Sequence, residues 1–387
     1  MQALTESIDK RAIIIGGSLA GLFAGVLLRT IGWQVDIYER SAHSLDSRGG
    51  GVVLQADVIR VFKQAGIATD TLGVDATERY YIQKDGSIEN MAMRQTLTSW
   101  NILYRSMRKN FPDDHYHQGK TLIEVQTNDN KATAIFTDGT IETADLLIGA
   151  DGPQSTVRQQ LLPSYMPQYA GYVAFRGLVD EADLPSNAAK IFTERFVFYD
   201  FPNSQILAYL IPGENESLVS GTRRFNWVWY VNYDEQTELP AILTDKNDRQ
   251  RAHSIPPDMI ATGSERTMRD YADLVLVEPF KTLVASTKAP FVQSILDLEV
   301  PQMVFDNIAL IGDAAFIPRP HTAASTAKAA ANALALVQAL VSNCHDVRSA
   351  LQSWQIEQLA YGRQLCAHGQ RLGNNSQFSY GKGRMVV

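Results

Sequence analysis

The sequence predicts an α/β fold (α+β overall): a Rossmann-like parallel sheet with an inserted, mainly antiparallel β domain. Three observations support this prediction. A strand, a glycine-rich turn, a helix and a second strand follow one another near the N-terminus. The middle of the chain, from about residue 168 to 289, is rich in Tyr, Phe and Trp and contains several strand-like runs. A buried strand and a long alanine-rich helix follow towards the C-terminus.

The N-terminal unit is the clearest of the three. Residues 12–15 form a short apolar run, which is typical of a buried strand. Residues 16–21 are a glycine-rich turn, residues 22–31 are rich in Leu, Ala and Val without proline, and residues 34–38 read as a second strand. A helix that connects two strands in this way predicts a parallel sheet covered by helices.

The later elements are predicted from the same patterns. Alternation and an Asp-Gly turn predict a β-meander over residues 121–148 that ends in a buried strand. The aromatic middle region and the C-terminal part add strands at 171–179, 196–201, 205–211 and 307–311 and a helix at about 322–341.

Composition limits the classes of protein that the chain can belong to. Its 387 residues have a net charge of −7, with 45% hydrophobic and 20% charged residues. This is enough apolar material for about two domains and argues against nucleic acid as a partner. Cys344 and Cys366 are too few for a disulfide framework. Without a long apolar segment or a signal-like N-terminus, we expect a cytoplasmic protein with no membrane contact.

The turn at residues 16–21 has the features of a dinucleotide-binding site. Gly16 and Gly21 occupy the first and third positions of the G-x-G-x-x-G pattern, and Ser18 replaces the second glycine. Glu39 lies 23 residues after Gly16, at the end of the second strand, where an acid can bond ribose hydroxyls. The alternative is an ordinary strand-to-helix turn without a ligand.

Two later motifs indicate which dinucleotide. Residues 149–158 match G-A-D-G-x-x-S-x-V-R, and residues 309–315 are A-L-I-G-D-A-A, with Pro320 beyond them. With the first turn, these motifs resemble those of the single-component FAD-dependent aromatic hydroxylases, the family of p-hydroxybenzoate and salicylate hydroxylases. The resemblance covers essentially the whole chain. Residues 52–55, 169–177 and 317–321 resemble more narrowly the hydroxypyridine-hydroxylating members.

The resemblance implies an activity and a domain organisation. FAD would be bound, NADH or NADPH would be a transient co-substrate, and O2 and a small aromatic molecule would be the other partners. A flavin C4a-hydroperoxide would hydroxylate a hydroxylated aromatic or hydroxypyridine-like ring. The FAD-binding domain would comprise residues 1–75, 100–167 and 285–387, and the substrate domain residues 76–99 and 168–284. A homodimer is compatible with the resemblance.

The same resemblance assigns cofactor contacts. Gly16, Ser18 and Gly21 would hold the FAD pyrophosphate, Glu39 the adenosine ribose, and Asp313 the ribityl chain. The positive N-terminus of the alanine-rich helix would approach the flavin ring. The other cofactor-binding candidates are Gly17, Leu19, Ala20, Arg40, Arg48, Gln55, Arg105, Val125, Asp151, Arg158, Gly312, Ala323, Ala324 and Ser325.

The chain departs from the family pattern at three places. Ser18 replaces a glycine, Ala323 and Ser325 stand where glycines are usual, and Asn332 stands where aspartate is common. Where φ is positive, each replaced glycine costs about 1 kcal/mol or more. We expect FAD binding to survive, since backbone amides make most of the phosphate contacts. These departures also leave open a flavin-binding protein without turnover.

Candidates for catalysis and substrate binding lie in two regions. His321 follows Pro320 in the turn expected beside the flavin, where imidazole could deprotonate a substrate hydroxyl or bond the oxygen of a hydroxypyridine. Tyr172 and Arg176 share a face of one predicted strand. Together with Pro320, further candidates for the substrate pocket are Tyr199 and Tyr209. The alternative for each is packing, and for Arg176 a structural role between domains is favoured.

Other functions and sites are compatible with parts of the sequence. His115 and His117 form an H-x-H pair without further ligands nearby, so no metal site is predicted. A flavin-dependent reductase or oxidase, or an enzyme that modifies a larger polyketide or drug-like molecule, stays open as an alternative function.

Overall fold

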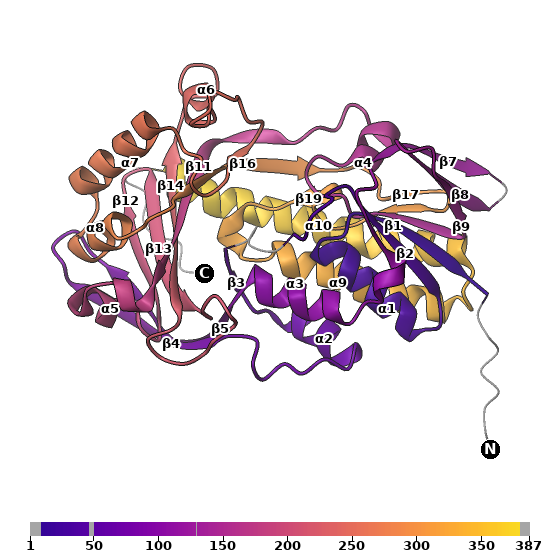
Figure 1. The fold of residues 1–387 in the computed structure, drawn as a ribbon, viewed down its shortest axis with the longest axis horizontal. Helices are drawn as coiled ribbons and strands as arrows, with labels where there is room; N and C mark the ends of the chain where they lie inside the picture. The colour runs from indigo at the N-terminus through magenta and orange to yellow at the C-terminus, as the bar shows by residue number, and fades with distance from the viewer. Residues whose placement is uncertain (1–8, 46–49, 129, 380–387) are drawn as a thin grey trace.

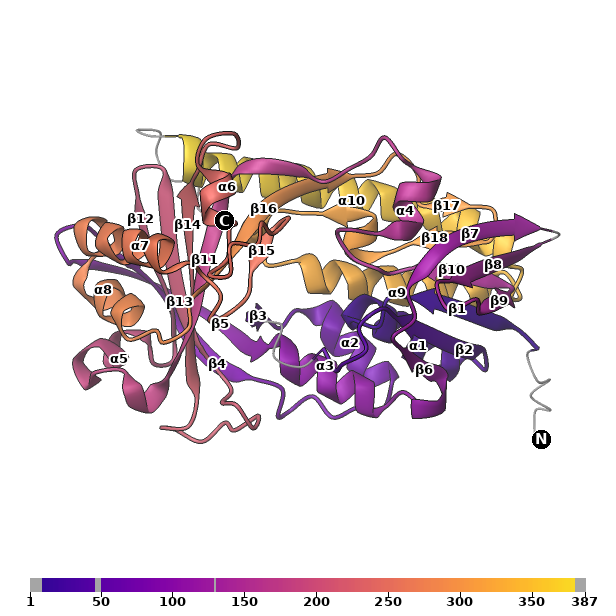
Figure 2. The ribbon, with the colours of Figure 1, turned by 45° about the horizontal axis from the view of Figure 1, so that its top comes forward.

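The computed structural model describes residues 9–45, 50–128 and 130–379 (Figure 1). A smaller, mostly parallel sheet contains the N-terminal unit, and a larger, mainly antiparallel sheet contains the aromatic middle of the chain. The two sheets lie towards opposite ends of the long axis, and helix α10 (Val347–Phe378) extends across both parts (Figures 1 and 2). The predicted α/β fold with a mainly antiparallel insertion is confirmed.

The smaller sheet has the strand order β17-β18-β10-β1-β2-β6. All its pairs are parallel except β17 with β18. Its strands are β1 (Arg11–Ile15), β2 (Gln34–Glu39), β6 (Tyr116–Gln118), β10 (Leu146–Gly149), β17 (Val304–Phe305) and β18 (Ile308–Leu310). The meander of β7 (Leu122–Asn128), β8 (Lys131–Phe136) and β9 (Ile141–Ala144) packs beside it.

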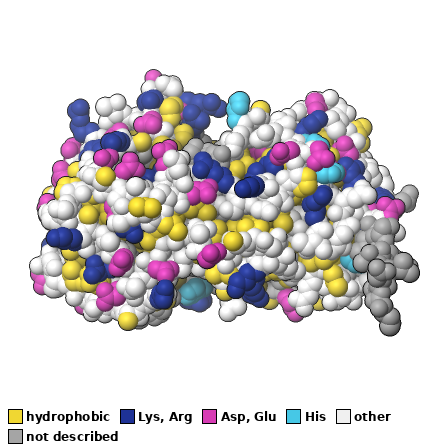
Figure 3. Space-filling model, turned by 60° about the horizontal axis from the view of Figure 1, so that its bottom comes forward, with side chains coloured by type: hydrophobic (Ala, Val, Ile, Leu, Met, Phe, Trp, Pro, Cys, Tyr) yellow, Lys and Arg dark blue, Asp and Glu magenta, His cyan; other side chains and the backbone are white. Residues whose placement is uncertain are grey.

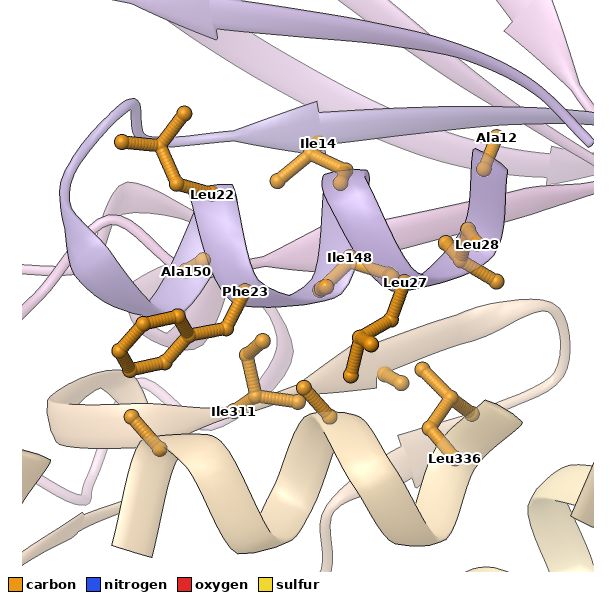
Figure 4. Close-up of a cluster of buried hydrophobic side chains, with 14 of the residues drawn as sticks. Ala12, Ile14, Leu22, Phe23, Leu27, Leu28, Ile148, Ala150, Ile311 and Leu336 are labelled. Atoms are coloured by element: carbon orange, nitrogen blue, oxygen red, sulfur yellow. The ribbon is translucent and has the colours of Figure 1, made fainter. Parts of the chain in front are cut away.

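The core of this part lies between the sheet and two helices. Helix α1 (Leu19–Thr30) packs against the sheet with one side and against α9 (Ser325–Ser342) with another. Figure 4 shows Ile14 and Ile148 of the sheet, Phe23 and Leu27 of α1, and Leu336 of α9 in this cluster. Further helices of the chain are α2 (Ala56–Gln64), α3 (Trp100–Lys109) and α4 (Thr156–Leu161).

The larger sheet has the order β15-β16-β11-β14-β13-β12-β4-β5-β3, and β19 pairs with β16. Its strands are β3 (Gly51–Val53), β4 (Val74–Ile82), β5 (Ile88–Ser99), β11 (Gln168–Asp180), β12 (Arg195–Phe201), β13 (Ser204–Ile211), β14 (Arg224–Asn232), β15 (Ser254–Ile255), β16 (Phe291–Glu299) and β19 (Phe316–Ile317). Helices α5 (Ser186–Phe192), α7 (Thr262–Val275) and α8 (Glu278–Ala285) cover one face, and α6 (Leu239–Ile242) lies near one end.

The two faces of the larger sheet are both apolar. Trp227 and Trp229 face the covering helices, and Phe196, Tyr209 and Tyr230 belong to a separate cluster on the other face. Strands β3, β16 and β19 come from segments predicted as FAD-binding, so the sheet extends across the predicted boundaries. The domain boundaries themselves stay a prediction.

Two surface properties complete the description. On the face drawn in Figure 3, basic and acidic side chains are interspersed. Among the described residues, no helix is long and apolar enough to cross a membrane.

Candidate active site

The turn between β1 and α1 has no room for a side chain at Gly16 or Gly21. Gly16 has a φ of +107°, and a Cβ there would lie 2.4 Å from the carbonyl oxygen of Ala150. A Cβ on Gly21 would lie 2.0 Å from the carbonyl oxygen of Gly16. Ser18 is the N-cap residue of α1, and its side chain makes no capping hydrogen bond. The first amides of α1 are therefore available to an anion in front of the helix.

Glu39, at the end of β2, supports this turn. Its two carboxylate oxygens accept hydrogen bonds from the backbone N–H groups of Gly17 and Ser41, both at 2.8 Å. The hydroxyl of Tyr116 donates to the carbonyl oxygen of Gly17 at 2.8 Å. Each carboxylate oxygen can accept another bond, so Glu39 can support the turn and still bond a ribose. Arg40, the next residue, is exposed.

The Gly312–Asp313 segment lies against the same turn. A Cβ on Gly312, whose φ is +62°, would lie 2.9 Å from the Cβ of Ala20. Asp313 Oδ1 accepts hydrogen bonds from Ser325 Oγ at 2.8 Å and Lys328 Nζ at 2.7 Å. Lys328 is fully buried and also donates to the carbonyl oxygen of Phe316. Lys328 was not among the predicted site residues, although a lone lysine in an alanine-rich helix was a visible signal.

Asp151 and Arg158 support the backbone of this region. Asp151 Oδ2 accepts the amides of Thr156 and Val157 at the start of α4, at 2.7 and 3.2 Å. Burial raises the pKa of Asp151. The buried guanidinium of Arg158 donates to three carbonyl oxygens, those of Pro153, Tyr165 and Ala314. The structure therefore gives Arg158 a bracing role, because these backbone acceptors engage its guanidinium.

The turn before α9 has Ala323 and Ser325 at the positions where the family pattern has glycines. Ala323 adopts the left-handed conformation with φ +51°, and α9 begins at Ser325. Gln55 Nε2 donates to the Ala323 carbonyl oxygen at 2.9 Å. Asn332 Oδ1 accepts from the backbone amide of Gly312 at 3.0 Å, so this residue also serves the site.

A cavity of about 1180 Å³ opens beside this turn. Its wall includes residues 320–323 of the turn, Gln55, the side chains of Phe196, Phe198 and Leu207 from the larger sheet, and Leu372 of α10. The cavity therefore lies where the glycine-bearing part of the fold meets the larger sheet. The aromatic wall from β12 was not predicted.

His321 lies in the wall of this cavity. Its Nε2 is 3.1 Å from the hydroxyl of Tyr172, and its ring centroid is 4.4 Å from that of Tyr230. Burial, together with the positive charge of Arg319, lowers the pKa of His321 to about 3. Burial also raises the pKa of the Tyr172 hydroxyl. The pair is thus a neutral imidazole against a protonated phenol.

Comparison with known proteins agrees with this geometry. Residues 169–297 match a family model described as FAD binding domain-like. The 2,6-dihydroxypyridine 3-monooxygenase of Paenarthrobacter nicotinovorans is 32% identical over 354 residues, which cover 91% of this chain and 88% of that protein. The chain belongs to the FAD-dependent aromatic monooxygenases.

Further relatives of this monooxygenase support the assignment. The structure of 2,6-dihydroxypyridine-3-hydroxylase from Arthrobacter nicotinovorans matches with a TM-score of 0.90 at 30% identity, covering 98% of this chain and 99% of that chain. The 6-hydroxynicotinate 3-monooxygenase of Pseudomonas fluorescens is 25% identical, covering 86% of this chain and 83% of that protein. Klebsiella pneumoniae HpxO, solved with FAD and uric acid, shares the fold. Its structure matches with a TM-score of 0.77 at 21% identity, covering 96% of this chain and 90% of that chain.

The residues present in this monooxygenase fit FAD. The absence of a Cβ at Gly16 lets the loop after β10 approach the start of α1, because a Cβ there would lie 2.8 Å from the Cα of Asp151. The buried Oδ1 of Asp151, next to this turn, has no hydrogen-bond partner among the described residues. Backbone amides at a helix N-terminus are suited to a pyrophosphate, and the acids Glu39 and Asp313 are suited to hydroxyl groups.

Several predicted site residues lie away from the cavity. Tyr199 lies on the opposite face of the larger sheet, and its hydroxyl donates to the Val275 carbonyl oxygen at 3.4 Å. Arg176 Nη1 donates to Gln293 at 3.1 Å behind Gly50. Tyr209 is buried against Gly51. None of these three side chains lines the cavity described here.

The remaining candidates are distributed around the predicted FAD-binding part. Val125 donates its amide to Gln160 at 2.9 Å in the meander. The Nη1 atom of Arg105 lies 3.8 Å from the Oε1 atom of Glu216, a residue of the β13–β14 loop. Arg48 lies outside the described residues. His115 and His117 both bond Asp36 Oδ1 at 3.0 Å, and the described residues contain no group of three ligands suited to a metal ion.

We expect Gly16→Ala to abolish FAD retention, because the new Cβ would collide with backbone atoms of the neighbouring loop. The measurement is the ratio of 450 nm to 280 nm absorbance of purified protein, with far-UV circular dichroism for folding. Gly263→Ala is the matched control, since a Cβ there meets nothing within 4 Å. Full FAD content in the Gly16 variant would refute the role of this turn.

We expect Ala323→Gly to stabilise the protein by about 0.5–1 kcal/mol, because glycine adopts positive φ without strain. The neighbouring Ala324, with φ −104°, is the matched control. There the same substitution should destabilise the protein, through the entropy that glycine adds to the unfolded chain. Thermal unfolding of both variants tests the difference, and equal shifts of the same sign would contradict it.

Proposed function

We propose that this monooxygenase uses NADH or NADPH and O2 to hydroxylate a small hydroxylated aromatic or N-heteroaromatic ring, of the hydroxypyridine kind. The observation that carries the proposal is the neutral imidazole of His321, which lies in the wall of a cavity that adjoins the Ala323 turn and is hydrogen-bonded to the buried hydroxyl of Tyr172. Support also comes from the relatives, whose names specify 2,6-dihydroxypyridine and 6-hydroxynicotinate as their substrates.

In this proposal the chain positions FAD through both glycine-containing segments. The α1 amides and the 16–21 turn would hold the pyrophosphate, Glu39 would bond the adenosine ribose, and Asp313 would bond the ribityl chain. The turn at 323–325 and the N-terminus of α9 would adjoin the flavin ring. Bound FAD would supply the redox chemistry that activates O2.

His321 would orient the substrate by donating a hydrogen bond. Arg319 lies over the ring of Tyr172, and its positive charge acts on the Tyr172 oxygen. In this proposal the Tyr172 hydroxyl would donate to His321 Nε2, and the imidazole proton would then be on Nδ1. An Nδ1–H donor suits a pyridone oxygen or a phenolate. Of the two roles predicted from the sequence, the geometry favours binding of the substrate oxygen over removal of its proton.

One observation favours the second candidate, a larger substrate. Ligand pockets commonly measure about 300–1,000 Å³, and this cavity reaches about 1180 Å³. Part of that space would be taken by the flavin ring, which is why a single-ring substrate stays the first proposal.

The proposal predicts that small hydroxylated rings stimulate NADH or NADPH consumption by the FAD-saturated enzyme under air. A panel of hydroxypyridines and phenols, each with either nicotinamide, is followed by absorbance at 340 nm and product mass. A product heavier by one oxygen atom establishes hydroxylation. Stimulation that yields only hydrogen peroxide rejects the ring tested as substrate. Stimulation by multi-ring phenols alone favours the larger substrate, and absence of stimulation by every compound contradicts the proposed function.

A second prediction concerns the imidazole of His321. Its pKa is near 6.5 in the unfolded chain and about 3 in the folded protein. Between these values the unfolded state binds the extra proton, so His321 destabilises the fold as the pH falls below 6.5. We expect His321→Gln to lose less stability than the wild type between pH 7.5 and 5, by about 2 kcal/mol at most. Urea titrations at both pH values measure this, and parallel losses would contradict it.

A further inference from the structure

Arg79 of β4 is a cation in the cavity wall that has no carboxylate partner among the described residues. Its Nε donates to Gln95 Oε1 at 2.9 Å, and its other N–H groups have no acceptor in the described part of the chain. Arg94, which also lines the cavity, is paired with Asp75 at 2.6 Å. A guanidinium that is held in place but not neutralised is able to bind an anion.

An aromatic surface lies next to this guanidinium. The Arg79 Cζ is 5.7 Å from the ring centroid of Phe196 and 5.6 Å from that of Phe198. The two rings are stacked, with centroids 4.4 Å apart. Leu207 of the neighbouring strand extends this apolar wall. A planar ring packed against these side chains would place a substituent next to Arg79.

The Arg79 guanidinium points along β5 towards the turn at 320–323, which is expected to lie beside the flavin. Arg79 lies opposite Met91, yet its side chain reaches Gln95, four residues further along β5. The carbonyl oxygen of the next residue, Thr96, accepts a hydrogen bond from the backbone N–H of Leu54 at 2.9 Å. Gln55 then bonds the Ala323 carbonyl oxygen. A short series of contacts therefore connects Arg79 with the turn that contains His321.

The acidic residues of the cavity lie further from that turn. Glu89 is opposite Tyr81, two residues from Met91 in the direction away from Gln95. Asp200 is two residues beyond Phe198 on β12, and its Oδ1 accepts from Gln205 Nε2 at 2.6 Å. Two residues along a strand correspond to roughly 7 Å. The cavity thus places Arg79 nearer the turn than either acid.

We propose that Arg79 binds a carboxylate on the substrate ring, so that the substrate is a hydroxylated aromatic or N-heteroaromatic acid. This inference rests on the proposed function and narrows its substrate class. A guanidinium presents parallel N–H donors that match the two oxygens of a carboxylate. The relatives leave the point open, because 6-hydroxynicotinate carries a carboxylate and 2,6-dihydroxypyridine does not.

The test compares matched ring pairs in binding, without turnover. FAD-loaded enzyme is titrated with 6-hydroxynicotinate against 2-hydroxypyridine, and with 4-hydroxybenzoate against phenol, by perturbation of the flavin spectrum. We expect at least one acid to bind about 10- to 100-fold more tightly than its partner. Arg79→Gln should remove this preference and leave the affinity for the uncarboxylated ring within about twofold, and Arg79→Lys should restore part of it.

Arg195→Gln is the matched control for these titrations. Arg195 precedes Phe196 on the adjacent strand, lies over the Tyr80 ring and does not line the cavity, so its replacement should leave the preference intact. Equal wild-type affinity within both pairs, or a preference that survives in Arg79→Gln, would overturn the inference. Should Arg79→Gln fail to fold, the wild-type pairs and Arg79→Lys decide the question.

The two proposals can fail separately. Selective binding of the acids without ring-stimulated consumption of NADH or NADPH would count against the proposed function and would support the role of Arg79. Hydroxylation of uncarboxylated rings with unselective binding would support the proposed function and reject the role of Arg79.

Discussion

Direct backbone contact between the loops after β1 and β10 is the constraint on which the candidate site depends. The Ala150 carbonyl oxygen lies 2.4 Å from the position of a Cβ on Gly16. The parallel sheet places the carboxyl ends of its strands at one edge, where ligands of such sheets bind. Gly312 reaches the same edge and packs against Ala20 of α1. Three separate segments therefore form one surface, and small residues are required at each contact.

An ion pair between the buried Lys328 and the partly exposed Asp313 extends this surface to the cavity. Lys328, on α9, bonds Asp313 and the Phe316 carbonyl oxygen, and Asn332 of the same helix bonds the Gly312 amide. A buried ammonium is costly unless it is paired, so these contacts fix α9 relative to the Gly312 loop. The turn that contains Ala323 leads directly into α9. The position of His321 is thus determined by the same packing that brings the Gly16, Ala150 and Gly312 segments together at the edge of the parallel sheet.

The sequence predicted the parts of the site in which the backbone restricts residue type. Glycines at close approaches, the acid after β2 and the Gly312–Asp313 pair are local signals that survive without an alignment. The cavity wall was harder to predict. Phe196 and Phe198 lie on one face of β12 and Tyr199 lies on the other, and both faces are apolar. Alternation shows that these residues divide between two faces, but only tertiary packing shows which face meets the cavity. The place of Arg79 beside the aromatic wall could not be predicted either, because it results from the long-range pairing of β4 with β12.

The distribution of charge separates two tasks in the cavity. The His321 imidazole packs against the rings of Tyr172 and Tyr230 and lies near Arg319, so protonation would add a second positive charge there. His321 is therefore a neutral hydrogen-bond donor in the turn, and such a donor can bond either a neutral or a negatively charged oxygen atom. Positive charge is available instead at Arg79, on a different strand and against an aromatic wall. A substrate that spans both groups is oriented by two chemically different contacts, and such a pair fixes which ring carbon faces the flavin more firmly than either contact alone.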